Sequence, residues 1–193
     1  MRRSISIWII SLCIFLVACQ TDERTPIDVT MYNISNDAIG TATLSEQPDG
    51  VKVKLSLEGL EEGFHGIHVH EYPKCEAPDF KTAGNHFNPE GKEHGLMHPE
   101  GSHLGDLPNI EVDSDGIVEA ELTLSGATLM DGKNSLLRQD GTSLIIHATK
   151  DDGISQPAGE AGERVACGKI SLDEKNSNPP TDPTESNKEK EEK

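Results

Sequence analysis

The sequence predicts an all-β domain, built as a sandwich or barrel of about eight antiparallel strands, and three observations support this prediction. Short apolar runs alternate with polar residues, most clearly in 51–57, where every second residue is Val or Leu. Turn-forming residues separate these runs, since the 193 residues include 18 Gly and 11 Pro. Aromatic residues make up only 4% of the chain, so its core is expected to be aliphatic.

A secretory signal is predicted at the start of the chain, in residues 1–18. Arg2 and Arg3 form a basic start, and a mostly apolar stretch follows in 5–17. The four residues that end in Cys19 resemble the lipobox of bacterial lipoproteins. That resemblance implies that Cys19 is acylated on sulfur and becomes the mature N-terminus.

The alternative for this segment is an uncleaved transmembrane anchor, because residues 4–21 carry no charge. Under the lipoprotein interpretation, residues 19–26 form a lipidated tether. Both interpretations place the domain outside the cytoplasm, and the first anchors it by lipid to a bacterial membrane.

The folded domain is predicted to span residues 27–172. Its expected strands, in chain order, are 27–34, 40–45, 51–57, 66–70, 117–124, 143–148 and 165–170. Turn sequences separate several of them: Pro48-Asp49-Gly50, Asp113-Ser114-Asp115-Gly116, Asp131-Gly132 and Asp140-Gly141.

One long segment, residues 71–109, lacks a sustained period of either strand or helix. It holds four of the eight histidines and is rich in Gly and Pro. Irregular loops longer than about 15 residues are usually functional or disordered. Something other than secondary structure must hold this loop, and a metal ion is the obvious candidate.

Residues 173–193 are predicted to be a disordered, charged tail, because they contain no apolar side chain. The whole chain has a net charge of −17, from 17 basic and 34 acidic residues. Without Arg2 and Arg3, 15 basic residues remain against 34 acidic ones, a net charge of −19. This balance argues against nucleic-acid binding, which depends on Lys and Arg contacts to phosphates.

The four cysteines have different expected fates. Cys13 leaves with the signal and Cys19 carries lipid, so Cys75 and Cys167 remain in an oxidising compartment. A disulfide between Cys75 and Cys167 is therefore predicted, and two buried free thiols are the alternative.

Histidines form the chemical signature of the sequence. His68 and His70 lie two positions apart on a predicted strand, so both point to the same face and can bind one ion. The other candidate ligands are His86, His94, His103, Asp106 and His147. Imidazole suits zinc and copper, and a mixed set of His and Asp ligands suits zinc.

The sequence resembles the bacterial copper-zinc superoxide dismutases. The matching segments are Gly66-Ile67-His68-Val69-His70-Glu71, Gly84-Asn85-His86-Phe87-Asn88-Pro89, Lys92-Glu93-His94-Gly95, His103-Leu104-Gly105-Asp106-Leu107-Pro108-Asn109 and Ala161-Gly162-Glu163-Arg164-Val165-Ala166-Cys167-Gly168. The resemblance implies a Greek-key antiparallel sandwich or barrel with long metal-binding and active-site loops.

The resemblance also implies the ligands of two metal ions. It assigns four copper ligands, His68, His70, His86 and His147. It assigns four zinc ligands, His86, His94, His103 and Asp106. His86 would bridge the two ions as an imidazolate, and Asp151 would hydrogen-bond ligands of both metals, here His68 and His94. An ordinary loop acid is the alternative for Asp151.

Arg164 would lie beside the open copper position and bind superoxide, and a surface arginine paired with Glu160 or Glu163 is the alternative. The implied reaction converts superoxide to dioxygen and hydrogen peroxide while copper cycles between Cu(II) and Cu(I). His65 and His98 match no ligand of the family and are expected at the surface or in loops.

A second class of function is a metal-binding lipoprotein that uses the same fold for zinc stability or copper handling without turnover. The presence of His86 favours the enzyme. Because family members occur as monomers and as dimers, the resemblance leaves open whether this chain is a monomer or a homodimer.

Overall fold

The computed structural model of the protein describes residues 24–172. The predicted signal 1–18, the predicted lipid site Cys19 and the predicted tail 173–193 lie outside this range. Among the helices of residues 24–172, none has the length and apolar character required to cross a membrane.

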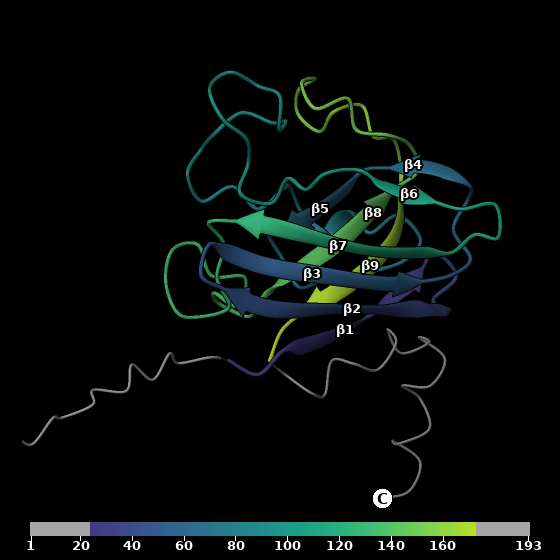
Figure 1. The fold of residues 1–193 in the computed structure, drawn as a ribbon, viewed down its shortest axis with the longest axis horizontal. Coiled ribbons are helices and arrows are strands. Elements are labelled where there is room, and N and C mark those ends of the chain that lie inside the picture. The colour runs from purple at the N-terminus through teal and green to yellow at the C-terminus, as the bar shows by residue number, and fades with distance from the viewer. Residues whose placement is uncertain (1–23, 173–193) are drawn as a thin grey trace, which may run out of the picture.

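Residues 24–172 contain nine strands and one short 3-10 helix, η1 (Lys81–Ala83). The strands are β1 (Ile27–Asn33), β2 (Ala38–Gln47), β3 (Gly50–Leu57), β4 (Gly63–His65), β5 (Ile67–His70), β6 (Ile110–Val112), β7 (Val118–Ser125), β8 (Thr142–His147) and β9 (Arg164–Ile170). Seven of them form one curved sheet in the order β5-β8-β9-β1-β2-β3-β7, and β4 pairs with β6 (Figure 1). The predicted all-β fold is confirmed.

The sheet order places strands from distant parts of the sequence side by side. β9, the last strand, lies between β8 and β1, and every pairing within the seven-stranded sheet is antiparallel. Long connections therefore cross the ends of the curved sheet, as in Greek-key folds. Two of these connections, residues 71–109 and 148–163, carry the candidate site.

The pair β4 and β6 was not predicted as such. β5 matches the predicted strand 66–70 except for Gly66, and β4 lies before that strand; Gly66 separates β4 from β5, and its backbone bonds to both Thr149 and His147. β6 lies just beyond the long irregular segment and is only three residues long. Strands of three residues are too short to show an alternating pattern, so these two strands could not be recognised from sequence.

β3 shows how the alternating pattern forms the core. Val51, Val53 and Leu55 are fully buried, whereas the intervening Lys52 and Lys54 lie on the outer face. β3 pairs in continuous register with β2 and with β7. Each buried Val or Leu side chain contributes about 1.5–3 kcal/mol relative to an exposed one, which fixes the register of the strand.

A second, smaller apolar cluster lies outside the barrel, between the long loop and β8 and β9. It consists of Cys75, Phe80, Ala83, Ile145 and Cys167. The predicted disulfide between Cys75 and Cys167 is present, with the two Cα atoms 5.6 Å apart and a sequence separation of 92. The cluster and the disulfide pin the start of the loop to the sheet.

The two long connections lie on the same side of the barrel, away from β1 and β2 (Figure 1). The 71–109 segment also runs beside β5. The Val69 amide donates to the Gly105 carbonyl (2.9 Å), and the Val69 carbonyl accepts from the Phe87 amide (2.8 Å). This pairing brings both ends of the histidine-rich segment next to the two histidines of β5.

Candidate metal centre

The strand β5 places His68 and His70 on its outer face. Because strand side chains alternate, Ile67 and Val69 point into the barrel core and the two imidazoles point into the space covered by the long loops. Both histidines are completely buried. The shape of β5 therefore confirms that the two rings share one face.

Four histidines meet in what we call the first cluster: His68, His70, His86 and His147. Their ligand nitrogens all lie within 4.8 Å of one another. β5 supplies two of the rings, the end of β8 supplies His147, and the segment beside β5 supplies His86. These residues are the four that the family resemblance assigns to copper.

Oxygen acceptors fix the orientation of three rings in the first cluster. His68 donates from Nε2 to the Asp151 carboxylate (2.8 Å), and His70 and His147 donate from Nδ1 to backbone carbonyls (3.0 and 3.2 Å). The opposite nitrogens, Nδ1 of His68 and Nε2 of His70 and His147, are buried without a hydrogen-bond partner. Their lone pairs are free to bind a shared ion.

A second cluster adjoins the first and consists of His86, His94, His103 and Asp106. The Asp106 carboxylate lies 2.8 Å from His86 Nδ1, 3.2 Å from His94 Nδ1 and 3.3 Å from His103 Nδ1. Backbone amides of Gly95 and His103 donate to Asp106 Oδ2 and hold the carboxylate in place. Three imidazoles and one carboxylate form a typical zinc ligand set.

His86 belongs to both clusters and presents a different nitrogen to each. Its Nδ1 faces Asp106 and His103, and its Nε2 is buried without a partner on the side of the first cluster. The His86 ring centroid is 4.1 Å from that of His68 and 5.3 Å from that of His103. One imidazole is thus positioned to contact two ions.

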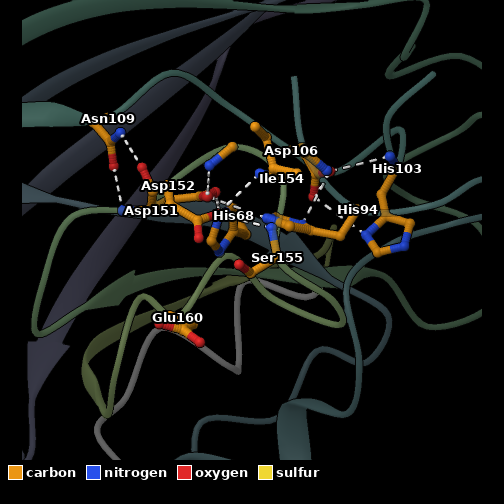
Figure 2. Close-up of polar contacts among 12 residues, drawn as sticks. His68, His94, His103, Asp106, Asn109, Asp151, Asp152, Ile154, Ser155 and Glu160 are labelled. Carbon is orange, nitrogen blue, oxygen red and sulfur yellow. Dashed lines mark hydrogen bonds and ion pairs between the residues drawn. The ribbon is translucent and has the colours of Figure 1, made fainter. Parts of the chain in front are cut away.

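Asp151 links the two clusters through one histidine of each. Its carboxylate accepts hydrogen bonds from His68 Nε2 (2.8 Å) and His94 Nε2 (3.2 Å), the two contacts expected from the sequence. Asn109 holds the Asp151 backbone through two bonds of 2.8 Å each (Figure 2). The Asp151 carboxylate thus contacts one ring from each cluster.

Burial and the nearby carboxylates set the protonation of the rings in opposite directions. Burial lowers the pKa of His147 to about 3 and that of His86 to about 4, and it lowers the pKa of His70 well below its usual range. Burial opposes protonation of His94 as well, but hydrogen bonds with Asp106 and Asp151 raise its pKa to about 9. These three rings of the first cluster are thus ready to bind a cation as neutral imidazoles.

Hydrogen bonds from these histidines also act on the two acids. Burial opposes ionisation of Asp106 and Asp151, yet the hydrogen bonds they receive hold the pKa of both carboxyls below the usual range. Both groups are therefore carboxylates at neutral pH, the state required of a metal ligand and of its hydrogen-bond partner.

A cavity of about 400 Å³ opens onto the clusters. Its lining includes His86, His147, Pro157, Ala158 and Arg164. Its remaining lining residues are Glu71, Asn85, Asn88 and His103. A small anion entering this cavity would meet three cluster histidines and one guanidinium group.

Arg164, at the start of β9, is held by two backbone carbonyls. It donates to Phe80 (2.7 Å) and to Gly84 (2.7 Å), so the alternative pairing with Glu160 or Glu163 does not occur. The Gly84 carbonyl also accepts from His70. One loop carbonyl thus fixes the cation and a ligand of the first cluster together.

The loop backbone is unusual at the two residues that hold Arg164. Phe80 adopts a left-handed conformation (φ 50°) while its ring is fully buried in the disulfide cluster. Gly84 has φ 80°, and a β-carbon there would overlap the side chains of Glu71 and Tyr72. The roles of Phe80, Gly84 and Asn109 could not be predicted from the sequence. Phe80 and Gly84 act through their backbone carbonyls, and Asn109 binds the backbone of Asp151.

The expectation for His65 was wrong. His65 ends β4 and is only 3% exposed, with Nδ1 2.7 Å from the His147 carbonyl and Nε2 2.8 Å from the Glu61 carbonyl. It fixes the backbone of a first-cluster histidine and is not a surface residue. His98 is partly exposed in the long loop, as expected.

The donor sets fit copper and zinc. The first cluster offers four imidazole nitrogens, which suit copper, and the second offers three imidazoles and a carboxylate, which suit zinc. His68, His70, His94 and His147 also have hydrogen-bond acceptors for one ring nitrogen, as metal-binding histidines almost always do.

Comparisons with known proteins agree with this geometry. The family described as copper/zinc superoxide dismutase matches residues 38–170. The chain is 42% identical over 159 residues to Cu-Zn superoxide dismutase 2 of Aquifex aeolicus, an alignment that covers 81% of this chain and 93% of the relative. It is 39% identical over 145 residues to the superoxide dismutase-like protein YojM of Bacillus subtilis, covering 74% of each.

Solved structures show the same relationship. The Cu/Zn superoxide dismutase from Brucella abortus has a TM-score of 0.64 and 32% identity, covering 76% of this chain and 99% of that one. A SOD-like protein from Bacillus subtilis has a TM-score of 0.73 and 35% identity, covering 76% of this chain and 99% of that one.

An antiparallel barrel carrying two histidine clusters that share one ring defines a class of proteins built for two neighbouring metal ions. Within that class, this chain belongs to the copper/zinc superoxide dismutase family, whose cofactors are copper and zinc.

Proposed function

We propose that the protein is an extracytoplasmic superoxide dismutase that converts superoxide to dioxygen and hydrogen peroxide. The observation that carries the proposal is the shared ring of His86, which faces the three other imidazoles of the first cluster on one side and the three other members of a zinc-type ligand set on the other. Family membership supports the same reaction.

In this proposal the first cluster, His68, His70, His86 and His147, holds copper, and the second cluster, His86, His94, His103 and Asp106, holds zinc. Copper bound there would supply the one-electron redox chemistry by which one superoxide is oxidised to dioxygen and a second is reduced to hydrogen peroxide. The protein's task is to bind the anion, position it and supply a proton.

Arg164 binds the superoxide anion. Its guanidinium is fixed by the Phe80 and Gly84 carbonyls and lines the cavity beside His86 and His147. A charge-assisted hydrogen bond from such a fixed cation is stronger than one between neutral groups, and it needs no reorganisation when the anion arrives.

His86 supplies one of the two protons that hydrogen peroxide requires, and water supplies the other. Its Nε2 faces the first cluster without a hydrogen-bond partner, so this nitrogen can hold a proton, and the His86 residue lines the cavity. Asp106 and His103 keep the other side of the ring in a fixed orientation. The reaction consumes two superoxide anions and two protons and forms one dioxygen and one hydrogen peroxide.

We also propose that the domain is attached to a bacterial membrane through lipid on Cys19. The support is the signal-like segment that ends in a lipobox-like sequence. The disulfide between Cys75 and Cys167 is consistent with an oxidising compartment.

The alternative, a metal-binding lipoprotein without turnover, has one observation in its favour. A relative at 39% identity is named only a superoxide dismutase-like protein, so similarity at this level does not by itself specify the reaction. The complete ligand set and the fixed Arg164 favour the enzyme.

The test is to load the mature domain with copper and zinc and measure superoxide dismutation for wild type and two variants. We expect wild type to be active and His86→Ala to lose activity by at least 100-fold, because the shared ring and its proton are removed. His98→Ala, which changes a histidine outside both clusters, is the matched control and should retain activity. A copper-loaded wild type without dismutation would favour the alternative.

A further inference from the structure

The side chain of Gln156 contacts a zinc-cluster residue in an unusual way. Its Oε1 accepts from the His94 amide (2.9 Å) and its Nε2 donates to the His94 carbonyl (3.0 Å), so one side-chain amide binds both backbone groups of His94. Its Nε2 also donates to the carbonyl of Ile154 (3.0 Å). Gln156 therefore connects the 148–163 loop to the residue that presents a zinc-type ligand.

We propose that Gln156 is a positioning residue that couples zinc binding at His94 to the shape of the anion cavity. This inference rests on the proposed function, because it assigns zinc to the second cluster and the substrate to the cavity.

The residues that follow Gln156 form part of the cavity wall. Pro157 and Ala158 line the cavity together with His86, His147 and Arg164. Gln156 thus directly precedes the two wall residues, Pro157 and Ala158. Because its side chain binds the His94 backbone, the position of His94 determines where this part of the wall begins. A displacement of His94 would be passed directly to Pro157.

Close packing limits the freedom of this segment on its other side. Gly159 has φ 64°, and a β-carbon there would overlap the Asp151 carboxylate and the His94 ring. The loop therefore packs directly against the side chains of Asp151 and His94. Residues 156–159 contact His94 at its backbone and pass over its ring.

Two further contacts join the same parts of the two loops. The Met97 amide donates to the Gly153 carbonyl (3.1 Å). A β-carbon at Gly95 would overlap the same Gly153 carbonyl, so only glycine allows the two loop backbones to lie this close. The hydrogen bonds between the loops that involve His94 itself are those from Gln156 and the ring contact with Asp151.

These contacts suggest a physical route for the coupling. Two carboxylates, those of Asp106 and Asp151, face the nitrogens of the His94 ring. Zinc would fix the ring, the ring would fix the His94 backbone, and Gln156 would transfer this order to Pro157 and Ala158. In this way zinc would keep the anion cavity open in one shape.

The test uses the metal-free mature domain, Zn(II) alone and three variants. Zn(II) affinity is measured by competition with a chromophoric chelator, and amide hydrogen exchange of residues 158–162 is followed with and without zinc. Gln156→Ala removes both contacts to His94. Gln156→Glu retains an acceptor for the His94 amide and places a carboxylate against the carbonyl. Gln47→Ala is the control, because among residues 24–172 the hydrogen bond of the Gln47 side chain is to the neighbouring Glu46 carbonyl in β2.

We expect zinc to slow exchange of 158–162 in wild type and in Gln47→Ala. In Gln156→Ala, zinc affinity should fall by about 10- to 100-fold, the range typical for partners of metal ligands. Even at saturating zinc, exchange of 158–162 should stay near its metal-free rate. Gln156→Glu should show the same loss of zinc-dependent protection, so the test does not depend on one variant folding.

Two results would overturn the inference while leaving the proposed function intact. One is wild-type zinc binding that protects 158–162, with equal protection in the Gln156 variants. The other is wild-type zinc binding with no protection of 158–162 at all. A wild-type domain that binds no zinc would instead contradict the proposed function, and the inference with it.

Discussion

At the scale of single residues, the site depends on which nitrogen each histidine keeps free. Carbonyls and carboxylates accept the N–H of one nitrogen, so the ring presents the other nitrogen to the ion. His94 is the exception, because both of its nitrogens face carboxylates: Nδ1 faces Asp106 and Nε2 faces Asp151, each at 3.2 Å. In the metal-free protein this ring is an imidazolium.

This protonation predicts how zinc affinity changes with pH. The pKa of His94 is raised to about 9, so at pH 7 the ring carries a proton on Nδ1 that zinc must displace. Zinc binding should therefore release about one proton at pH 7. Affinity should rise about tenfold per pH unit until pH approaches 9. Calorimetry in two buffers of different ionisation enthalpy measures the proton count, and release of no proton would contradict the assignment.

Most ligands could be predicted at this scale, because ligand identity resides in side chains at characteristic spacings. His68 and His70 followed from strand alternation alone, whereas His86, His94 and His103 needed the resemblance to assign their roles. His65 could not be placed, because its burial comes from the pairing of β4 with β6, which had no sequence signal.

At the scale of elements, the long loop gains its shape from three separate attachments. It pairs with β5 through Phe87 and Gly105, and the disulfide ties it to β9. Its own Phe80 is buried in the apolar cluster. The sequence indicated that the loop was irregular and needed support. Its path could not be predicted, because isolated backbone bonds and left-handed residues leave no periodic pattern.

Phe80 tests whether the apolar cluster positions Arg164. Phe80→Ala should destabilise the protein by about 3–5 kcal/mol, the usual cost of removing a buried phenylalanine ring. It should also weaken inhibition by a small anion such as azide. Without the buried ring, the backbone at position 80 is no longer anchored, and its carbonyl would no longer hold Arg164 in place. Chemical denaturation and inhibition assays of the metal-loaded enzyme measure the two effects.

Phe64→Ala is the matched control, since Phe64 is 51% exposed, and its effect on stability should be below about 1 kcal/mol. Unchanged azide inhibition in Phe80→Ala, despite the loss of stability, would show that Arg164 is held without help from Phe80.

At the scale of the whole molecule, an anionic substrate approaches a strongly acidic protein. The chain has a net charge of −17, and Arg164 shares the cavity lining with Glu71. The positive charge that favours substrate is local, whereas the repulsion comes from the entire surface. Salt at 0.1 M screens exposed charges beyond about 10 Å and therefore reduces the distant repulsion most.

The rate of dismutation should therefore rise as ionic strength increases from about 0.01 to 0.15 M. Pulse radiolysis or stopped-flow measurement of superoxide decay at fixed pH provides the test. A rate that falls with added salt would show that the local positive charge outweighs the overall negative charge.

The proposed site depends on one imidazole, that of His86, binding two different ions. Anomalous X-ray diffraction from crystals of the copper- and zinc-loaded domain, recorded at both metal edges, tests it most directly. We expect a copper peak about 2.0–2.1 Å from His86 Nε2 and a zinc peak at a similar distance from His86 Nδ1. A single metal on His86, or two metals that do not share its ring, would contradict the claim.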